Sequence, residues 1–269
     1  MMWAAESLEV PSRVRLRDGS VALVDPSDAL GRTVYYAGDW DPKITWACRR
    51  LLRPGDTFLD IGAHCGVVAL AAAHAVGEGG QVHAFEPNPE LARLLIDAAA
   101  LNGYAQLRTH EVALSDEDGE AELHLALGHS FFGSLSRRRD LPGRTIPIAL
   151  RHASRYLETL DLPRIRMIKI DVEGHEETVL AALQRVFSRT PPDAVIIETD
   201  DFELPYWKRG SVLALRAAGY HMLGIPKSLF RVRPQIVRPD EPPPREFHDS
   251  IGVSPGAFAE VCERLGVRA

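Results

Sequence analysis

The sequence predicts an α/β fold, a Rossmann-like domain in which helices cover both faces of a mostly parallel sheet. Short apolar runs typical of buried strands alternate with helical patterns along most of the chain, as in proteins with parallel sheets. The 269 residues, of which 45% are hydrophobic, are enough to bury one large core. We therefore assign residues 39–269 to one domain and residues 1–38 to an N-terminal β-hairpin extension.

The extension is predicted to contain two paired strands. The runs 13–17 and 21–24 flank an Asp-Gly pair, which favours a tight hairpin turn. A helix over residues 40–52 follows and ends before a Pro-Gly pair that cannot continue it. Asp41 stands at the start of this helix, where a carboxylate can cap backbone N–H groups.

Residues 57–66 read as a buried strand that enters a glycine turn, and a helix over 67–76 follows. Asp60 lies near the strand end, and Gly62 and Gly66 let the backbone turn tightly beside a ligand. The order D-x-G-x-x-x-G differs from the G-x-G-x-x-G pattern of dinucleotide sites, and its carboxylate would repel a pyrophosphate. A cationic cofactor without phosphate fits better, and S-adenosylmethionine carries an ammonium and a sulfonium.

The next predicted strand covers residues 81–86 and ends at Glu86. An acidic residue about 20 positions after the glycine turn is where a carboxylate binds the two hydroxyls of a ribose. Glu86 therefore predicts the second half of a nucleoside-binding site. A nicotinamide-dependent oxidoreductase would use the same carboxylate, but the missing G-x-G-x-x-G pattern opposes that alternative.

The rest of the chain predicts further strands and helices in alternation. They are a helix over 89–101, a strand over 107–114, a hairpin into a strand over 121–125, a strand over 167–171, a helix over 175–187, a strand over 194–199, a helix over 210–218 and a strand over 220–225. Ligands bind at the carboxyl ends of such strands. One crevice is therefore expected to collect Asp60, Glu86, Val112, Ala113 and Asp171.

Four segments together resemble the FkbM family of S-adenosylmethionine-dependent methyltransferases: FLDIGA at 58–63 with Gly66, AFEPNP at 84–89, VALSD at 112–116 with Gly119, and IKIDVEG at 168–174. The resemblance covers about residues 35–200. It implies a class I methyltransferase fold whose final antiparallel strand includes Ile251. It also implies S-adenosylmethionine as the cofactor, and the family places an acidic residue near Asp41 against that cofactor.

Carried over residue by residue, the family's cofactor contacts fall on Asp60, Gly62, Ala63, His64, Gly66, Glu86, Pro87, Asn88, Val112 and Ala113. His64 stands where the family usually has asparagine. The resemblance implies a small-molecule hydroxyl of sugar or secondary-metabolite type as the acceptor. Methylation of a carboxylate or nitrogen on a peptide or small acceptor stays open, as does a cofactor-binding protein without catalysis.

The catalytic residues are expected in the D-V-E-G-H segment. Methyl transfer to a hydroxyl requires alignment and removal of its proton. Asp171, Glu173 and His175 are the candidates, with His175 as the base, although His175 could be a surface residue and Glu173 a helix cap. These three with Glu198 and Asp200 could also gather around a hard cation, but we expect no metal.

Residues 128–146 are expected to form a loop over the acceptor. Phe131 and Phe132 replace the small residues of a glycine-serine turn in the family, which suggests an altered acceptor pocket. The segment also contains four arginines, Arg137, Arg138, Arg139 and Arg144. A solvated surface loop is an equally good interpretation of these charges.

Charge and composition exclude several partners. The formal net charge is −6, with no basic stripe, so we expect no nucleic-acid partner. No apolar run approaches the ~20 residues of a membrane span, so we expect no membrane partner. Cys48, Cys65 and Cys262 are scattered without a C-x-x-C pair, which indicates a reduced, cytoplasmic environment. A homodimer stays open.

Overall fold

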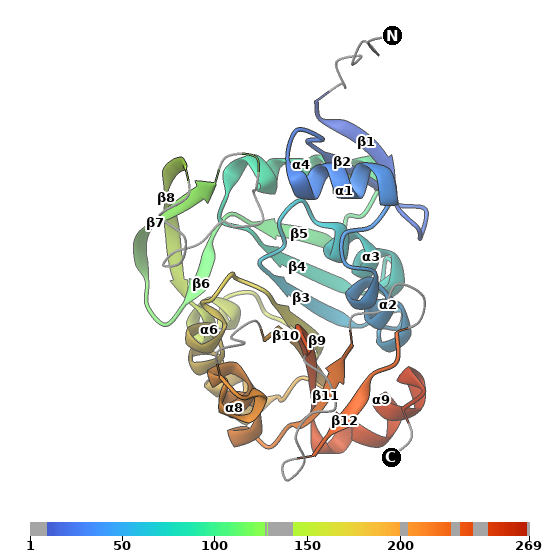
Figure 1. Cartoon of the computed structure of the whole chain (residues 1–269), viewed down its shortest axis with the longest axis vertical. Helices are drawn as coiled ribbons and strands as arrows, with labels where there is room; N and C mark the ends of the chain where they lie inside the picture. The colour runs from blue at the N-terminus through green and yellow to red at the C-terminus, as the bar shows by residue number, and fades with distance from the viewer. Residues whose placement is uncertain are drawn as a thin grey trace.

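The computed structural model describes residues 10–126, 128, 142–199, 204–226, 232–238 and 247–267. Its centre is an eight-stranded sheet in the order β12-β11-β13-β10-β9-β3-β4-β5 (Figure 1). The strands of this sheet are β3 (Thr57–Ile61), β4 (Gln81–Phe85), β5 (Leu107–His110), β9 (Ile165–Ile170), β10 (Ala194–Glu198), β11 (His221–Ile225), β12 (Gln235–Val237) and β13 (Asp249–Val253).

The strand directions confirm the predicted class I methyltransferase fold. Strands β10, β9, β3, β4 and β5 pair in parallel. Strand β13 is antiparallel to both of its neighbours, β10 and β11, as the expected final strand should be. Because parallel strands end at the same edge, the residues that follow β3, β4 and β9 come together there.

Helices cover both faces of the sheet (Figure 1), and alternate residues of each strand pack on opposite sides. In β3, Phe58 packs with α2, α3, α4 and α9, while Leu59 packs with α5 to α8, and both side chains are fully buried. The helices are α1 (Ala29–Ala37), α2 (Pro42–Leu51), α3 (Val67–Val76), α4 (Pro89–Asn102), α5 (Ala153–Glu158), α6 (Glu176–Ala182), α7 (Gln184–Arg189), α8 (Gly210–Ala217) and α9 (Phe258–Leu265).

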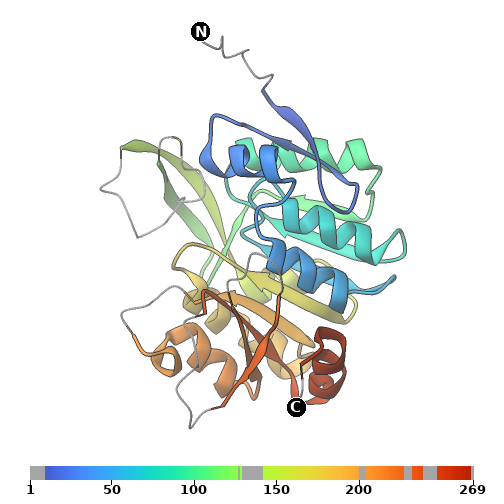
Figure 2. The same ribbon diagram turned by 45° about the vertical axis from the view of Figure 1, so that its right-hand side comes forward.

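The predicted hairpin is present as β1 (Ser12–Arg15) and β2 (Val21–Val24), and it packs on α4. The side chain of Asn102 accepts a hydrogen bond from Val21 N and donates one to Val21 O, each at 2.7 Å. The sequence analysis missed α1, whose N-terminus is capped by the Asp28 carboxylate. Figure 2 shows the hairpin and α1 together beside α4.

The predicted strand over 107–114 was wrong, because the chain turns after His110 and Val112 N bonds back to His110 O at 2.9 Å. Beyond the turn, β6 (Ala113–Ser115) enters a separate sheet in the order β6-β8-β7. Its other strands are β7 (Gly119–Ala126), which the sequence analysis predicted, and β8 (Gly143–His152), which it missed. Arg144 and Ile146, assigned to a loop, therefore belong to a strand.

The single helix predicted over 175–187 was also wrong. Leu183 leaves regular helical geometry at φ −87° and ψ −1° and buries its side chain completely between α6 and α7. The apolar pattern continues across the break because both helices pack on the same cluster. Periodicity alone could not reveal this interruption.

Candidate active site

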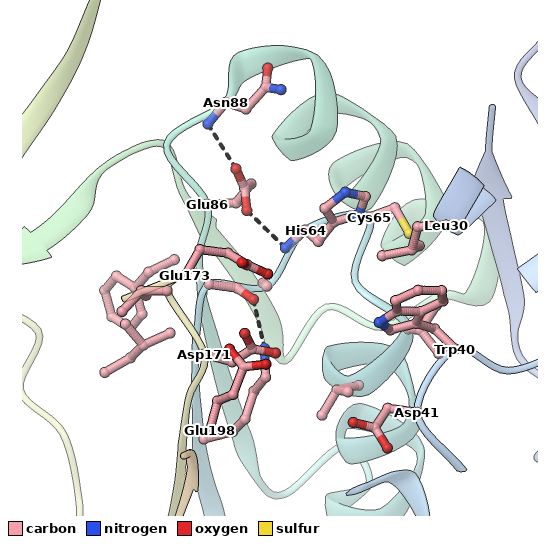
Figure 3. Close-up of a pocket in the computed structure, with 18 of the residues that line it drawn as sticks. Leu30, Trp40, Asp41, His64, Cys65, Glu86, Asn88, Asp171, Glu173 and Glu198 are labelled. Atoms are coloured by element: carbon pink, nitrogen blue, oxygen red, sulfur yellow. Dashed lines mark hydrogen bonds and ion pairs between the residues drawn. The ribbon is translucent and has the colours of Figure 1, made fainter. Parts of the chain in front are cut away.

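A cavity of about 820 Å³ opens at the carboxyl ends of β3, β4 and β9 (Figure 3). The ends of these strands form one part of its lining, and sheet β6-β8-β7 contributes an apolar part through Leu123, Leu125 and Ile148. The segment from Leu30 to Lys43 contributes a third part, so the unpredicted helix α1 borders the site. A cavity of this size lies within the range of about 300–1,000 Å³ typical of cofactor and ligand sites.

The turn after β3 requires glycine at position 62. Gly62 has φ +80°, and a Cβ atom there would lie 1.8 Å from the backbone oxygen of Asp171. Gly62 N and Ala63 N both donate to Phe85 O at 3.0 Å, which ties the turn to the end of β4. The glycine therefore allows two strand-end turns to meet beneath the cavity.

Glu86 is held by two backbone donors. Its Oε2 accepts from His64 N at 2.8 Å and its Oε1 from Asn88 N at 2.9 Å (Figure 3). Burial still raises the pKa of Glu86 to about 7. A fixed carboxylate in this position can accept hydrogen bonds from a vicinal diol.

The cavity brings together most of the residues predicted to bind the cofactor. Those lining it are Gly62, Ala63, His64, Glu86, Pro87, Asn88, Val112 and Ala113. Asp60 and Gly66 do not line it. Asp60 is fully buried beneath the turn, and Gly66 starts α3 at φ +84°, packed against Leu95.

Lys169 was missed by the sequence analysis, although it lies among the predicted residues. Its ammonium donates to Gly62 O at 2.7 Å and lies 3.3 Å from Asp60 Oδ1 and 3.4 Å from Asp171 Oδ2. These carboxylates raise the pKa of Lys169 against the effect of burial, which lowers it. A lysine among the apolar residues at the carboxyl end of a buried strand was the available signal, because buried lysines are almost always paired.

The predicted catalytic segment borders the cavity through Asp171, Glu173 and His175. Glu173 lies in the turn after β9 with φ +53°. The Glu176 carboxylate accepts hydrogen bonds from Val172 N and Gly174 N, so Glu176 stabilises this turn. His175 stands at the N-cap position of α6 without capping it. The predicted residues therefore lie together, on a turn fixed by a glutamate whose role went unpredicted.

His175 belongs to a short polar chain. Its Nε2 lies 3.0 Å from Ser115 Oγ, and that hydroxyl donates to Asp116 Oδ1 at 3.1 Å. Burial lowers the pKa of His175, an effect that the nearby Asp116 partly opposes. The imidazole is therefore neutral at pH 7 and able to accept a proton.

A second charged group of the lining was also missed. Lys43 Nζ contacts Asp249 Oδ2 and lies 3.6 Å from Asp41 Oδ1. Burial raises the pKa of Asp249 to about 7 and that of Asp41 above its ordinary value. Asp41 stands at the N-cap position of α2 without a side-chain capping hydrogen bond, and it also lines the cavity.

Three carboxylates, those of Asp171, Glu173 and Glu198, each place an oxygen within 4.8 Å of the others. His175, which the metal hypothesis included, bonds to Ser115 instead, and Asp200 lies outside the described residues. Among the described residues, the lining has seven acidic side chains and three basic ones, with histidines left out. The cavity is therefore negatively charged overall, which favours a cationic ligand.

Most of the predicted acceptor loop, including Phe131, Phe132 and Arg137 to Arg139, lies outside the described residues. Arg144 pairs with Glu90 on α4 at 2.5 Å, and both side chains are mostly exposed. In the described part of the chain, no helix has the length and apolar character needed to cross a membrane.

Comparisons with known proteins identify the family of the chain. The model of the methyltransferase FkbM domain matches residues 60–222, more than half of the chain. The 31-O-demethyl-FK506 methyltransferase FkbM of Streptomyces tacrolimicus is 28% identical over 49% of this chain and 61% of its own length. The chain thus spans less than two thirds of that relative.

Two solved structures are similar at low sequence identity. The methyltransferase FkbM of Methylobacillus flagellatus has a TM-score of 0.45 and 15% identity, covering 89% of this chain and 56% of that one. An S-adenosylmethionine-dependent O-methyltransferase of Thermotoga maritima has a TM-score of 0.44 and 14% identity, covering 93% and 95%. On the domain match, the chain belongs to the FkbM family of methyltransferases.

Proposed function

We propose that this enzyme methylates a hydroxyl group of a small molecule. The observation that carries the proposal is that one cavity contains both the Gly62 and Glu86 wall and the turn with Asp171 and His175. The residues proposed to bind the cofactor and those proposed to remove the proton therefore line the same cavity. Transfer between two bound molecules requires such a shared space, because the reacting atoms must be held close and in line.

The lining fits S-adenosylmethionine, which supplies an electrophilic methyl group on a positively charged sulfur when bound. The excess of carboxylates suits its ammonium and sulfonium charges. Glu86 is fixed by two backbone donors to accept hydrogen bonds from ribose hydroxyls. Ala63, His64, Pro87, Asn88, Val112 and Ala113 complete the proposed cofactor wall.

His175 acts as the base in this proposal. The single proton of the Ser115 hydroxyl is donated to Asp116, so the hydrogen bond between Ser115 and His175 requires Nε2–H as the donor. The neutral ring then carries its free lone pair on Nδ1. Nδ1 of His175 receives the hydroxyl proton as the acceptor oxygen is methylated, and Asp171 orients the acceptor.

The acceptor is proposed to be a small, uncharged or cationic molecule with an apolar portion. The acidic lining opposes a carboxylate acceptor and a polyanionic nucleic acid. The apolar part of the lining suits a hydrocarbon portion. The name of the Streptomyces relative gives 31-O-demethyl-FK506 as the molecule that it methylates, which supports a secondary-metabolite hydroxyl. A homodimer stays a prediction.

The test is incubation of the purified protein with S-adenosylmethionine and a panel of hydroxylated, amine-bearing and carboxylate-bearing small molecules. We expect a methyl gain on oxygen in the hydroxylated set, detected by mass spectrometry. Exclusive methylation of nitrogen or of a carboxylate would overturn the proposal. We also expect activity to persist in EDTA, and its loss would favour a cation at Asp171, Glu173 and Glu198.

A further inference from the structure

Lys169 joins the two turns that the cavity depends on. Its side chain is 8% exposed, and its ammonium contacts three oxygen atoms: Gly62 O, Asp60 Oδ1 and Asp171 Oδ2. The ammonium thus donates one hydrogen bond to the Gly62 carbonyl and forms ion pairs with carboxylates at two different strand ends. Strand β3 supplies Asp60 and leads into Gly62, and strand β9 leads into Asp171.

The backbone contacts around Lys169 lead to the same pair of turns. Gly62 lies so close to the Asp171 carbonyl that no side chain fits between them. Asp171 N donates to Ile61 O at 3.1 Å, and Gly62 N donates to Phe85 O at 3.0 Å. The position of the cofactor turn and the position of the acceptor-side turn are therefore set by a common group of contacts.

We propose that Lys169 is a positioning residue of the methyl-transfer site, whose ammonium holds the Gly62 turn and the Asp171 carboxylate in one arrangement. It acts through these groups and takes no part in the reaction itself. The inference goes beyond the proposed function, since it holds for any methyl acceptor.

The charges around Lys169 explain why a lysine serves here. Asp60 is fully buried, and burial raises its pKa, so it needs a nearby cation to stay ionised. The Asp171 side chain is 37% exposed and can be hydrated on its other side. One ammonium therefore offsets the charge of a buried carboxylate and also pairs with an accessible one that borders the cavity.

The test replaces the buried pair with neutral groups in the double variant D60N/K169M. This change leaves no unpaired buried charge at the pair, because Asp171 can be solvated. The matched control is R166M/D193N on the same strand β9, where Arg166 pairs with Asp193 at 2.5 Å at the amino end of the strand, away from the cavity. Both proteins are titrated with S-adenosylmethionine by calorimetry, and amide hydrogen exchange is followed by mass spectrometry.

We expect D60N/K169M to lose about tenfold to hundredfold in affinity for S-adenosylmethionine, the equivalent of hydrogen bonds to a charged group. The peptides that contain Gly62 and Asp171 should exchange faster than in the unaltered protein. The control should keep its affinity and its exchange rates in both peptides. Unchanged affinity in D60N/K169M, or an equal loss in the control, would overturn the proposal.

A thermal melt separates these outcomes from a general loss of folding. We expect both double variants to unfold cooperatively. If D60N/K169M does not fold, K169R provides the second variant, because it keeps the charge but not the compact ammonium. Faster exchange in K169R at both turns supports the proposal, and exchange like that of the unaltered protein contradicts it. None of these measurements uses a methyl acceptor, so they remain decisive even if the proposed hydroxyl chemistry fails.

Discussion

The two ends of strand β9 carry basic residues with different surroundings: one joins parts of the fold, and the other borders the cavity. At its amino end, Arg166 bonds to the buried Asp193 at 2.5 Å and to Glu260 at 2.6 Å. At its carboxyl end, Lys169 lies between Asp60 and Asp171. Only three positions separate the two basic residues, yet Arg166 does not line the cavity and Lys169 does.

The difference lies in how well the negative charges are matched. At the amino end, arginine partners lower the pKa of Glu260, with the hydrogen bond from Arg166 as the largest cause. At the carboxyl end, burial raises the pKa of Glu86 and of Asp249 to about 7. The first group joins elements of the fold, while the second places buried carboxylates of raised pKa beside the cavity, where a cationic ligand would favour their ionised form.

The largest effect is expected from the proposed base. His175→Ala should lower turnover by about 10²–10⁴, because it removes a general base. Affinity for S-adenosylmethionine should change little, as measured by calorimetry. The control is His221→Ala, at an exposed position on β11. Normal turnover of the His175 variant with the true acceptor would assign proton removal to another group.

The amino-end cluster should matter for stability alone. Asp193→Ala should lower the free energy of unfolding by about 3 kcal/mol, because the largely buried Arg166 loses its closest carboxylate while it keeps Glu260. Denaturant titration gives the stability change. At denaturant concentrations below the unfolding transition, the affinity of the variant for S-adenosylmethionine should match that of the unaltered protein. A weaker affinity would show that the amino-end cluster also affects the cofactor site.

The ribose-binding role predicts a smaller loss in binding. Glu86→Ala should lower affinity for S-adenosylmethionine by about 1.5–3 kcal/mol, the value of hydrogen bonds to a charged group. Glu90→Gln is the control, since Glu90 follows on α4 but its side chain is 65% exposed. Equal affinities in the Glu86 variant and the control would remove Glu86 from the cofactor site.

The smallest effect is a dependence of binding on pH. A diol donates to an ionised carboxylate, so affinity for S-adenosylmethionine should rise by up to about tenfold from about pH 6 to 8 as Glu86 loses its proton. Calorimetry in buffers of different ionisation enthalpy should detect proton release below pH 7. Glu86→Gln should flatten the profile, and a persistent slope would point to Asp249.

The stability of the free protein should respond to pH in opposite ways at the two ends. A pKa raised to about 7 means that the stabilising contribution of Glu86 is full below its ordinary value of 4.5 and is lost as pH rises through about 7. Glu260, whose pKa is lowered, contributes above 4.5 and loses that contribution as pH falls. Denaturant midpoints of Glu86→Gln and Glu260→Gln across pH distinguish the two.

The sequence by itself determined the features that depend on local chemistry. Gly62 must be glycine because the backbone turns there with φ +80°. Runs of apolar residues predict the buried strands. The mostly parallel α/β fold followed from the order of these elements, and the family resemblance implied its class I methyltransferase form. Eight of the ten residues predicted to bind the cofactor line the cavity, because parallel strand ends meet at one edge.

Only the tertiary structure decided which distant side chains share that edge. Lys43 and Asp249 are more than two hundred positions apart along the chain, and their contact depends on where β13 enters the sheet. Long-range packing likewise produces the break between β5 and β6 and the position of α1 beside the cavity. It also brings together the three oxygens that contact Lys169. Local patterns specify which residues are buried, whereas the pairing of buried charges is set by the three-dimensional arrangement of elements.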